Sequence, residues 1–172
     1  MKPRQADGEK GGAMYTLTRL KDYLDREKVP YQHDVHRTAF TAQEVAAEEH
    51  ISGKLVAKTV VIKVDDQFAM AVLPATEHVD LFALKVALGA REVRLATEFE
   101  FTGLFPDCDV GAMPPFGNLY GLPVYVEQAL TTDPEIAFNA GTHQDTVRMS
   151  YWDYARLVQP RVLPFGLSRA AA

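Results

Sequence analysis

Cysteine is almost absent from this 172-residue sequence, in which Cys108 is the only one. No disulfide can form within the chain, so a reducing compartment suits it. The sequence also lacks an apolar run of the roughly 20 residues that a membrane-spanning helix needs, and its first residues lack the apolar segment of a signal peptide. We therefore expect a cytoplasmic protein without a membrane partner.

The motifs of common nucleophilic and nucleotide-binding enzymes are also missing. The chain contains no Gly-x-Ser-x-Gly, no Gly-x-x-x-x-Gly-Lys and no Gly-x-Gly-x-x-Gly. His33 and His36 would lie on opposite faces of a strand, and no cysteine or carboxylate pattern completes a metal site around them. Cys108 stands between Asp107 and Asp109, whose charges disfavour the nucleophilic thiolate. These residues favour neither a metal centre nor a catalytic cysteine.

Positive charge is scarce in the middle of the chain. Residues 31–147 hold seven Lys or Arg against 17 Asp or Glu, and both ends are net basic, within an overall formal charge of −5. Tight binding along a phosphate backbone needs several Lys or Arg contacts. A nucleic-acid partner would therefore be held locally, through one end bound in a pocket, with help from the basic termini or from a second protein.

The length and the 47% hydrophobic content fit one well-packed domain, which we place at residues 14–160. Residues 1–13 are polar and contain three glycines without periodicity, which predicts a disordered leader. Residues 161–172 are expected to form a loose C-terminal tail. The sequence carries no signal for an oligomeric state.

Helix-capping patterns recur along the chain. Thr41 with Glu44, and Thr97 with Glu100, have the spacing of capping boxes, and Asp80 resembles a further N-cap. Together with the spacing of the leucines near the N-terminus, these signals predict helices over 16–28, 41–50, 80–88, 97–104 and from 150 onward.

Runs of β-branched and aromatic residues predict strands over 31–36, 55–64, 68–73, 93–95, 122–127, 135–139 and 146–149. We expect the second and third to form an antiparallel hairpin with a three-residue turn at 65–67. One hairpin with interspersed helices indicates an α+β domain with a mixed sheet.

A lysine lies within the strand expected over 55–64. Because side chains alternate along a strand, Lys58 shares its face with Val60 and Ile62. An ammonium group in apolar surroundings either extends along its stem to water or binds an anion. The pattern leaves both open: a lysine at a strand end, or a functional anion site.

Two glycine-containing turns are the other candidates for a site. Residues 111–115 read Gly-Ala-Met-Pro-Pro, where Gly111 permits conformations that aim successive amides at one point. Residues 139–143 read Asn-Ala-Gly-Thr-His and add the hydroxyl of Thr142 and the imidazole of His143. Each alone is also explained as a plain turn, but with an inward Lys58 they form a coherent pocket for an ester or anion.

The motif Val-Ala-Lys-Thr-Val-Val at 56–61, the Gly-x-x-x-Pro at 111–115 and the Asn-Ala-Gly at 139–141 resemble, in this order, the YbaK/prolyl-tRNA synthetase-associated editing domain family. The resemblance covers about residues 17–160. It implies a mixed, strongly curved, barrel-like sheet flanked by helices, and a free-standing aminoacyl-tRNA deacylase that needs no metal or organic cofactor. The implied partner is the acceptor end of a mischarged tRNA, with an aminoacyl-tRNA synthetase as a second candidate.

The resemblance also implies roles for single residues. Lys58 corresponds to the pocket lysine beside the terminal adenosine, Gly111 and Pro115 to the loop that orients the ester, and Gly141 to the third motif. An aminoacyl ester is already activated, so positioning and oxyanion stabilisation suffice without a protein nucleophile. We add the hypothesis that His143 orients the water or protonates the leaving ribose oxygen.

The acyl pocket is where this sequence departs from the family pattern. Ala112, Met113 and Pro114 stand where the family's Cys-tRNA deacylases have a loop richer in Gly and Ser. Met113 and Phe116 indicate an apolar wall and hence a small uncharged amino acid. The expected substrate contacts are Thr59, Ala112, Met113, Pro115, Phe116, Gly141 and Thr142. The alternatives are a non-catalytic module of the same fold that binds aminoacyl-tRNA or a synthetase, and a small-molecule esterase, which the missing nucleophile motif disfavours.

Overall fold

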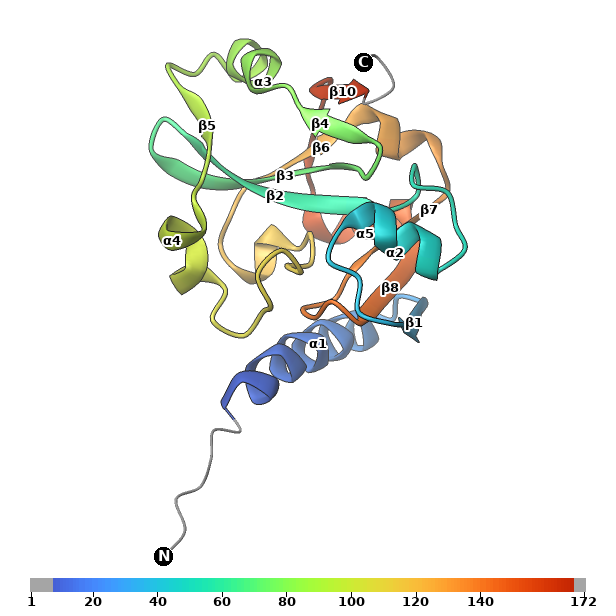
Figure 1. Ribbon diagram of the computed structural model, residues 1–172. Coiled ribbons are helices and arrows are strands. Elements are labelled where there is room, and N and C mark those ends of the chain that lie inside the picture. The colour runs from blue at the N-terminus through green and yellow to red at the C-terminus, as the bar shows by residue number, and fades with distance from the viewer. Residues whose placement is uncertain (1–7, 169–172) are drawn as a thin grey trace, which may run out of the picture.

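Three separate β-sheets organise the part of the chain that the structure describes (Figure 1). The computed structural model describes residues 8–168, with side chains from residue 15 onward. The strands are β1 (Tyr31–Val35), β2 (Ala57–Val64), β3 (Gln67–Pro74), β4 (Glu77–Val79), β5 (Val93–Leu95), β6 (Val124–Glu127), β7 (Glu135–Asn139), β8 (Asp145–Ser150), β9 (Arg161–Leu163) and β10 (Gly166–Ser168). The α-helices are α1 (Gly8–Arg26), α2 (Ala42–Glu48), α3 (Leu81–Leu88), α4 (Glu98–Phe101) and α5 (Tyr151–Val158), and short 3₁₀ helices cover Thr102–Leu104, Gly117–Leu119 and Gln128–Thr132.

The largest sheet has five strands in the order β5-β2-β3-β6-β9. Its centre is the antiparallel hairpin of β2 and β3, as predicted. β5 pairs antiparallel with β2, whereas β6 and β9 join in parallel, so the expected α+β class with a mixed sheet is confirmed. A second, antiparallel sheet has the order β1-β8-β7, and β10 pairs with β4.

The barrel-like curvature that the family resemblance implied is not found. Within residues 8–168 no sheet closes on itself. The five-stranded and three-stranded sheets meet through one bridge between Val56 and Ala137, where the Ala137 amide donates to the carbonyl oxygen of Leu55 over 2.9 Å. Because one bridge does not continue a ladder of hydrogen bonds, the two sheets remain separate.

The turn of the central hairpin is shorter than expected. Gln67 belongs to β3 and pairs with Val64, so the turn consists of Asp65 and Asp66 rather than three residues. Their φ angles are 46° and 67°, the conformation that suits the right-handed twist of the flanking strands. The Asp65 carboxylate also accepts hydrogen bonds from the amides of Arg91 and Glu92, which ties the turn to the start of β5.

The predicted helix caps are confirmed. Thr41 with Glu44 and Thr97 with Glu100 form complete capping boxes at the starts of α2 and α4. Asp80 caps α3, which ends at Gly89 in the left-handed conformation, with φ 61°. Ser150 likewise caps α5. These signals depend on residues three positions apart, so they could be found without knowing the tertiary structure.

Both ends of the described chain are more ordered than expected. α1 begins at Gly8, so residues 8–13, expected in a disordered leader, are helical; residues 1–7 lie outside the described residues. At the other end, residues 161–168 form β9 and β10 instead of a loose tail, and residues 169–172 lie outside the described residues. β9 and β10 are held by pairing with β6 and β4, which three-residue patterns do not reveal.

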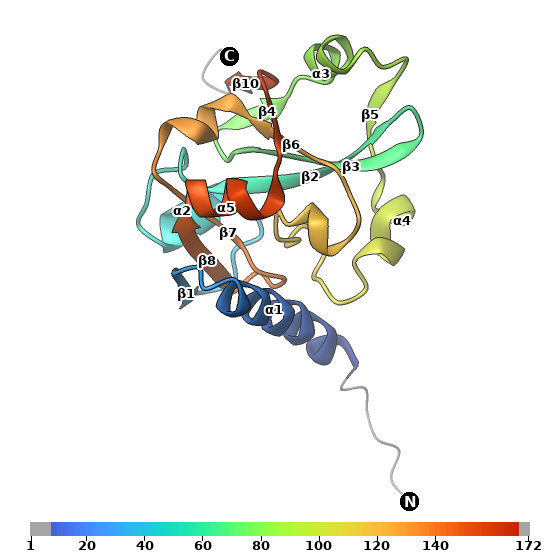
Figure 2. The same cartoon turned by 180° about the vertical axis from the view of Figure 1, so that it is seen from behind.

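Side chains cover both faces of the five-stranded sheet. Val61 and Met70 belong to the larger core cluster, which α1 joins through its predicted leucine face. Ile62 and Ala69 point the other way and pack with Leu84 of α3. Figures 1 and 2 accordingly show α3 on one side of this sheet, and α1 with the three-stranded sheet on the other. Among the described helices, none has the length and apolar character needed to cross a membrane.

Candidate functional site

Lys58 lines a pocket of about 230 Å³ at the start of β2, here called the Lys58 pocket. The side chain is half-buried, and its residue pairs with Leu73 across the hairpin. Gly111 lies in the wall of the same pocket, so the structure brings together the lysine and the first glycine turn that the sequence singled out. The complete lining is Phe40, Thr41, Ala42, Gln43, Lys58, Thr59, Ala75 and Gly111.

A larger pocket of about 560 Å³ adjoins the Lys58 pocket, and Gln43 lines both. Its wall includes Glu77, so we call it the Glu77 pocket. Burial and the charge of Glu127 raise the pKa of the Glu77 carboxyl, while the positive charge of Lys58 acts to lower it. The two pockets thus have opposite charges close to their junction.

Thr59 contributes an unusual polar group to the Lys58 pocket. Its hydroxyl oxygen is buried and has no hydrogen-bond partner among the described residues. An unpaired buried hydroxyl costs about 1–3 kcal/mol, so such groups are normally bonded to protein or water. Thr59 was predicted as a substrate contact; the residue lines the pocket, but its hydroxyl oxygen is buried in this conformation.

The two predicted glycine turns lie side by side. Gly111 and Gly141 have backbone φ angles of 83° and 97°, which residues with a Cβ rarely adopt. The Gly141 amide donates to the carbonyl oxygen of Ala112 over 2.9 Å, and the carbonyl oxygen of Gly141 accepts from the Asp109 amide at the same distance. The turns therefore form one hydrogen-bonded unit, part of which faces the Lys58 pocket.

His143, at the end of the second turn, reaches the backbone of the first. Its Nε2 is 2.8 Å from the carbonyl oxygen of Val110. A carbonyl oxygen only accepts, so Nε2 carries the proton and donates it to this bond. Nδ1 is buried without a hydrogen-bond partner among the described residues, and the ring packs on Phe40 with 5.0 Å between centroids. The imidazole therefore holds the backbone at Val110, immediately before Gly111, through this hydrogen bond.

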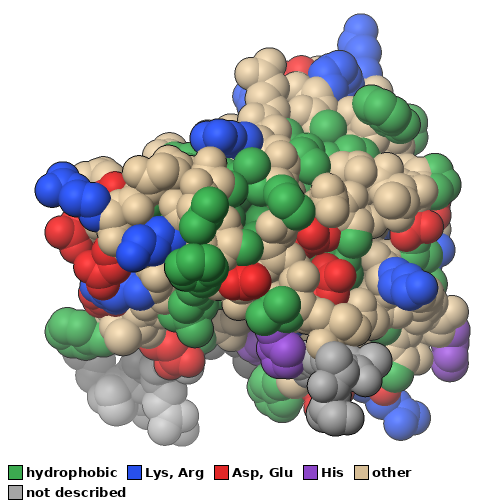
Figure 3. All heavy atoms as spheres, turned by 90° about the horizontal axis from the view of Figure 1, so that it is seen from above, with side chains coloured by type: hydrophobic (Ala, Val, Ile, Leu, Met, Phe, Trp, Pro, Cys, Tyr) green, Lys and Arg blue, Asp and Glu red, His purple; other side chains and the backbone are tan. Residues whose placement is uncertain are grey.

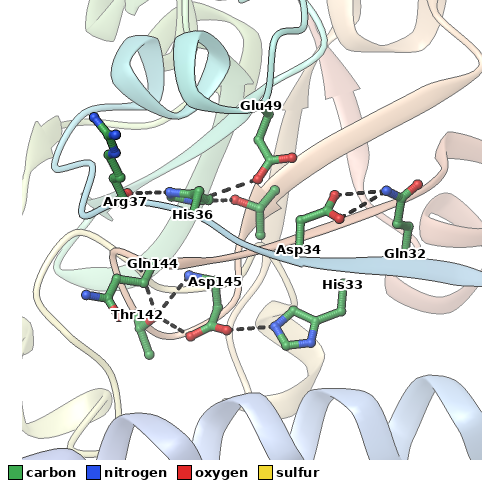
Figure 4. Close-up of polar contacts among 10 residues, drawn as sticks. Gln32, His33, Asp34, His36, Arg37, Glu49, Thr142, Gln144 and Asp145 are labelled. Atoms are coloured by element: carbon green, nitrogen blue, oxygen red, sulfur yellow. Dashed lines mark hydrogen bonds and ion pairs between the residues drawn. The ribbon is translucent and has the colours of Figure 1, made fainter.

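The hydroxyl of Thr142 is occupied within the second turn (Figure 4). It donates to Oδ2 of Asp145 over 2.5 Å and accepts from the amides of Gln144 and Asp145. Asp145 in turn accepts from Nε2 of His33 on β1 over 2.7 Å. These contacts give Thr142 a role in holding the turn, in addition to any contact with substrate.

The two histidines with metal-like spacing serve other contacts. His33 binds Asp145, whereas His36 contacts the carbonyl oxygen of Arg37 through Nδ1 and the hydroxyl of Thr146 through Nε2 (Figure 4). Among the side chains that the structure describes, no group of three or more His, Cys, Asp or Glu is arranged to hold a metal ion.

Met113 and Phe116, expected in an apolar wall of the pocket, are interior residues. Phe116 is fully buried and packs against the ring of Tyr154, with centroids 5.4 Å apart. Met113 is almost fully buried and lines a separate cavity of about 90 Å³ beneath the loop. Tyr154 also donates its hydroxyl to the carbonyl oxygen of Pro115 over 2.7 Å. The 111–116 loop is therefore anchored in the core, while Gly111 remains exposed at its start.

Cys108 lines the same 90 Å³ cavity. Burial raises the pKa of its thiol, and the charges of Asp107 and Asp109 act in the same direction. The thiol lies 3.4 Å from the hydroxyl of Thr16 and 3.6 Å from that of Tyr120. The expectation that its surroundings disfavour a thiolate is thus confirmed, with burial as the larger cause.

Five residues that line the Lys58 pocket were not predicted as site residues from sequence: Phe40, Thr41, Ala42, Gln43 and Ala75. Tyr154, which anchors the 111–116 loop from the core, was not predicted either. Phe40 stands just before the N-cap Thr41, where an apolar residue commonly packs onto its own helix. Here the side chain is 69% exposed at the rim of the Lys58 pocket. The sequence shows that an apolar residue stands at this position. It does not show that the side chain points toward the pocket.

Residues 36–157 match the model of the aminoacyl-tRNA editing domain family. The chain belongs to this family. The matched range includes Lys58, Gly111 and Gly141 and every residue that lines the Lys58 pocket. The motif-based resemblance is therefore confirmed for the part of the chain that forms the site.

Relatives of the aminoacyl-tRNA editing family cover nearly the whole chain. A multifunctional Ser/Thr-tRNA deacylase, ProXp-y, from Escherichia coli strain K12 is 29% identical over 161 residues, which is 87% of this chain and 92% of that protein. The crystal structure of a candidate trans-editing enzyme for prolyl-tRNA synthetase superposes with a TM-score of 0.77 at 20% identity, covering 89% of this chain and 98% of that one. A hypothetical protein superposes with a TM-score of 0.78 at 17% identity, covering 87% and 99%. The two structures support the fold.

Proposed function

We propose that this chain is a trans-editing hydrolase that cleaves the ester between a wrong amino acid and the 3′-terminal adenosine of tRNA. Membership of the aminoacyl-tRNA editing family and the similarity to a protein named as a Ser/Thr-tRNA deacylase support this function. The observation that carries the proposal is that Lys58 and Gly111 line one pocket, next to the unpaired hydroxyl of Thr59. A cation beside a glycine turn suits an ester whose carbonyl oxygen gains negative charge during hydrolysis.

In this proposal Lys58 stabilises the developing oxyanion, and the turn at Gly111 positions the ester. Thr59 lines the same pocket, and its buried hydroxyl gains the partner it lacks if the side chain turns to donate to the substrate. The attacking group is water or a hydroxyl of the substrate itself, because an aminoacyl ester is activated enough to react without a protein nucleophile. The acceptor end of tRNA is the bound partner, and a synthetase is a candidate for supplying the wider grip.

We assign His143 a positioning role in this reaction. Its Nε2 proton is used in the bond to the Val110 carbonyl oxygen, so it holds the backbone on which Gly111 depends. The buried Nδ1 has no partner that would orient it for proton transfer among the described residues. This replaces direct proton transfer by His143 as the first hypothesis to test.

We further propose that the edited amino acid is small and uncharged. The Lys58 pocket is the smaller of the two adjoining pockets, at about 230 Å³ against about 560 Å³. The similar E. coli protein is named for serine and threonine, so these two amino acids are the first to try.

The test is loss of the ester from a panel of tRNAs charged with serine, threonine, alanine or cysteine. We expect the wild-type protein to release at least one of these amino acids. Lys58→Ala is expected to reduce the rate by about 100-fold or more, the usual effect of removing one oxyanion-stabilising group. Lys63→Ala is the matched control, because Lys63 lies on the same strand but forms an ion pair with Glu100, 3.6 Å away.

Two outcomes would contradict the proposal in different ways. An unchanged rate in Lys58→Ala would overturn the site while leaving the activity. No hydrolysis of any substrate, together with retained binding of the charged tRNA, would instead favour the non-catalytic binding module.

A further inference from the structure

Phe40 is an exposed aromatic residue in a defined position at the substrate pocket. Its side chain is 69% exposed, and it lines the Lys58 pocket together with Lys58 and Gly111. Single exposed apolar residues are common and need no explanation by themselves. What distinguishes Phe40 is that it lines the same pocket as Lys58 and that its ring packs on His143.

The backbone of Phe40 is fixed on both sides. Its amide donates to Oε2 of Glu44 over 2.7 Å, as part of the capping interactions of α2. The preceding residue, Ala39, is buried and donates its amide to the carbonyl oxygen of His143 over 2.9 Å. The ring of Phe40 therefore projects from a segment that is held by both α2 and the second glycine turn.

The imidazole of His143 supports the Phe40 ring. The ring centroids are 5.0 Å apart and the planes are inclined by 55°. Because Nε2 of His143 is bonded to the backbone of Val110, the imidazole is itself fixed. One side of the phenyl ring thus rests on a rigid support, while most of its surface remains exposed to a ligand.

An exposed aromatic ring at the entrance of a pocket suits a flat ligand group. An ester that reaches Lys58 and Gly111 leaves the nucleoside to which it is attached nearer the rim. A nucleobase has a π-face that stacks on an aromatic side chain without need of charge. Lys and Arg do not gather into one basic patch on the face of the molecule seen in Figure 3, where they are interspersed with acidic side chains. Residues 31–147, which include the whole lining of the pocket, carry seven Lys or Arg against 17 Asp or Glu, so stacking would add affinity that charge does not supply.

We propose that Phe40 stacks on the terminal nucleobase of the tRNA and, with His143 as its support, positions the ester against Lys58. This inference rests on the proposed function and names the part of the substrate that the pocket rim recognises. Phe40 is thus a positioning residue that acts on the nucleoside, and it has no part in proton transfer.

Binding without turnover gives the first test. The probe is an acceptor-stem RNA hairpin whose terminal adenine is replaced by the fluorescent base 2-aminopurine and whose 3′ end carries serine through a stable amide. Stacking quenches 2-aminopurine, so we expect wild-type protein and Phe40→Tyr to quench the probe. Phe40→Leu, which keeps an apolar side chain but removes the ring, is expected to lose most of the quenching. Phe82→Leu is the matched control, since Phe82 is 74% exposed on α3.

Kinetics give the second test. Loss of one stacked base weakens binding by about 5- to 100-fold, so Phe40→Leu is expected to raise KM for the charged tRNA by that factor, with kcat much less affected. Phe82→Leu is expected to leave both constants unchanged. A substrate with an abasic terminal ribose is expected to show equal KM values for wild-type protein and Phe40→Leu.

The outcomes separate this inference from the proposed function. Unchanged quenching and KM in Phe40→Leu would overturn the stacking. An equal rise in KM with the abasic substrate would also overturn it, by showing that Phe40 contacts the amino acid instead. Failure of the proposed function would be seen separately, as wild-type protein that quenches the probe but hydrolyses no ester.

Discussion

The amide of Gly141 donates to the carbonyl oxygen of Ala112 over 2.9 Å, so the third sequence motif directly supports the loop of the second. The Asp109 amide in turn donates a hydrogen bond of the same length to the carbonyl oxygen of Gly141. Two turns that are far apart in the sequence therefore behave as one structural unit. A change in the backbone of either turn is expected to alter the wall of the Lys58 pocket.

Gly111→Ala tests whether this backbone unit matters for catalysis. The φ angle of 83° is unfavourable for alanine, and the new Cβ would lie 3.7 Å from Cε1 of His143, an ordinary contact. The expected loss of unfolding free energy is therefore about 1–2 kcal/mol from the backbone alone. We also expect slower deacylation, measured with the charged tRNA that the wild-type protein prefers.

Gly89→Ala is the control for Gly111→Ala. Gly89 has a φ angle of 61°, and no atom lies within 4 Å of the added Cβ. It ends α3, so a similar loss of stability is expected with an unchanged rate. Equal loss of activity in both variants would show that reduced stability, and not the geometry of the site, causes the effect.

The role of His143 can be decided from the pH dependence of the rate. If His143 is a positioning residue, His143→Ala misplaces the ester and is expected to lower kcat/KM by about tenfold or more. The shape of the pH profile between pH 6 and 8 is expected to be retained. His143→Gln keeps an N–H that can donate to the Val110 carbonyl oxygen, and it is expected to restore part of the rate. Loss of an inflection from the profile in both variants would instead identify His143 as a general acid or base.

The features that sequence predicted well are those encoded by neighbouring residues. Both capping boxes depend on residues three positions apart, and the central hairpin joins two strands that are consecutive in the sequence. Both features are found where expected, apart from the shorter turn of the hairpin. The pocket that Lys58 and Gly111 line was also predicted. That prediction depended on the family motifs, because no local pattern shows that these two distant residues lie close together.

The features that sequence missed depend on distant partners. β4, β9 and β10 have three residues each and are held by strands remote in the chain. The bond from the Tyr154 hydroxyl to the Pro115 carbonyl oxygen anchors the loop from α5, and no local pattern indicates it. For the same reason, Met113 and Phe116 could be recognised as apolar but not assigned to the core rather than to the pocket.

Glu77→Gln tests the electrostatics beside the site. Burial, and then the charge of Glu127, raise the pKa of Glu77 from its ordinary value of 4.5, and Lys58 opposes them. A carboxyl whose folded-state pKa is raised binds its proton more tightly in the folded protein, so stability falls as pH rises from 4.5 through the folded-state pKa. Glu77→Gln is therefore expected to be more stable than wild type at pH 7 and of equal stability at about pH 4.

Urea unfolding at these two pH values measures the effect of Glu77→Gln. Glu48→Gln, at an exposed position of α2, is the control and is expected to show no such difference between the two pH values. A loss of stability for Glu77→Gln at pH 7 would mean that attraction to Lys58 outweighs burial and repulsion from Glu127.

Thr59→Val separates stability from function at a single atom. The Thr59 hydroxyl is buried and lacks a partner among the described residues, and valine is nearly the same shape and favours strands. Removing an unpaired buried hydroxyl is expected to raise the free energy of unfolding by about 1 kcal/mol. If the hydroxyl binds substrate, the same change raises KM for the charged tRNA, whereas Thr59→Ser, which keeps the hydroxyl, stays close to the wild-type KM. A Thr59→Val protein that is more stable and retains the wild-type KM would exclude this hydroxyl as a substrate contact.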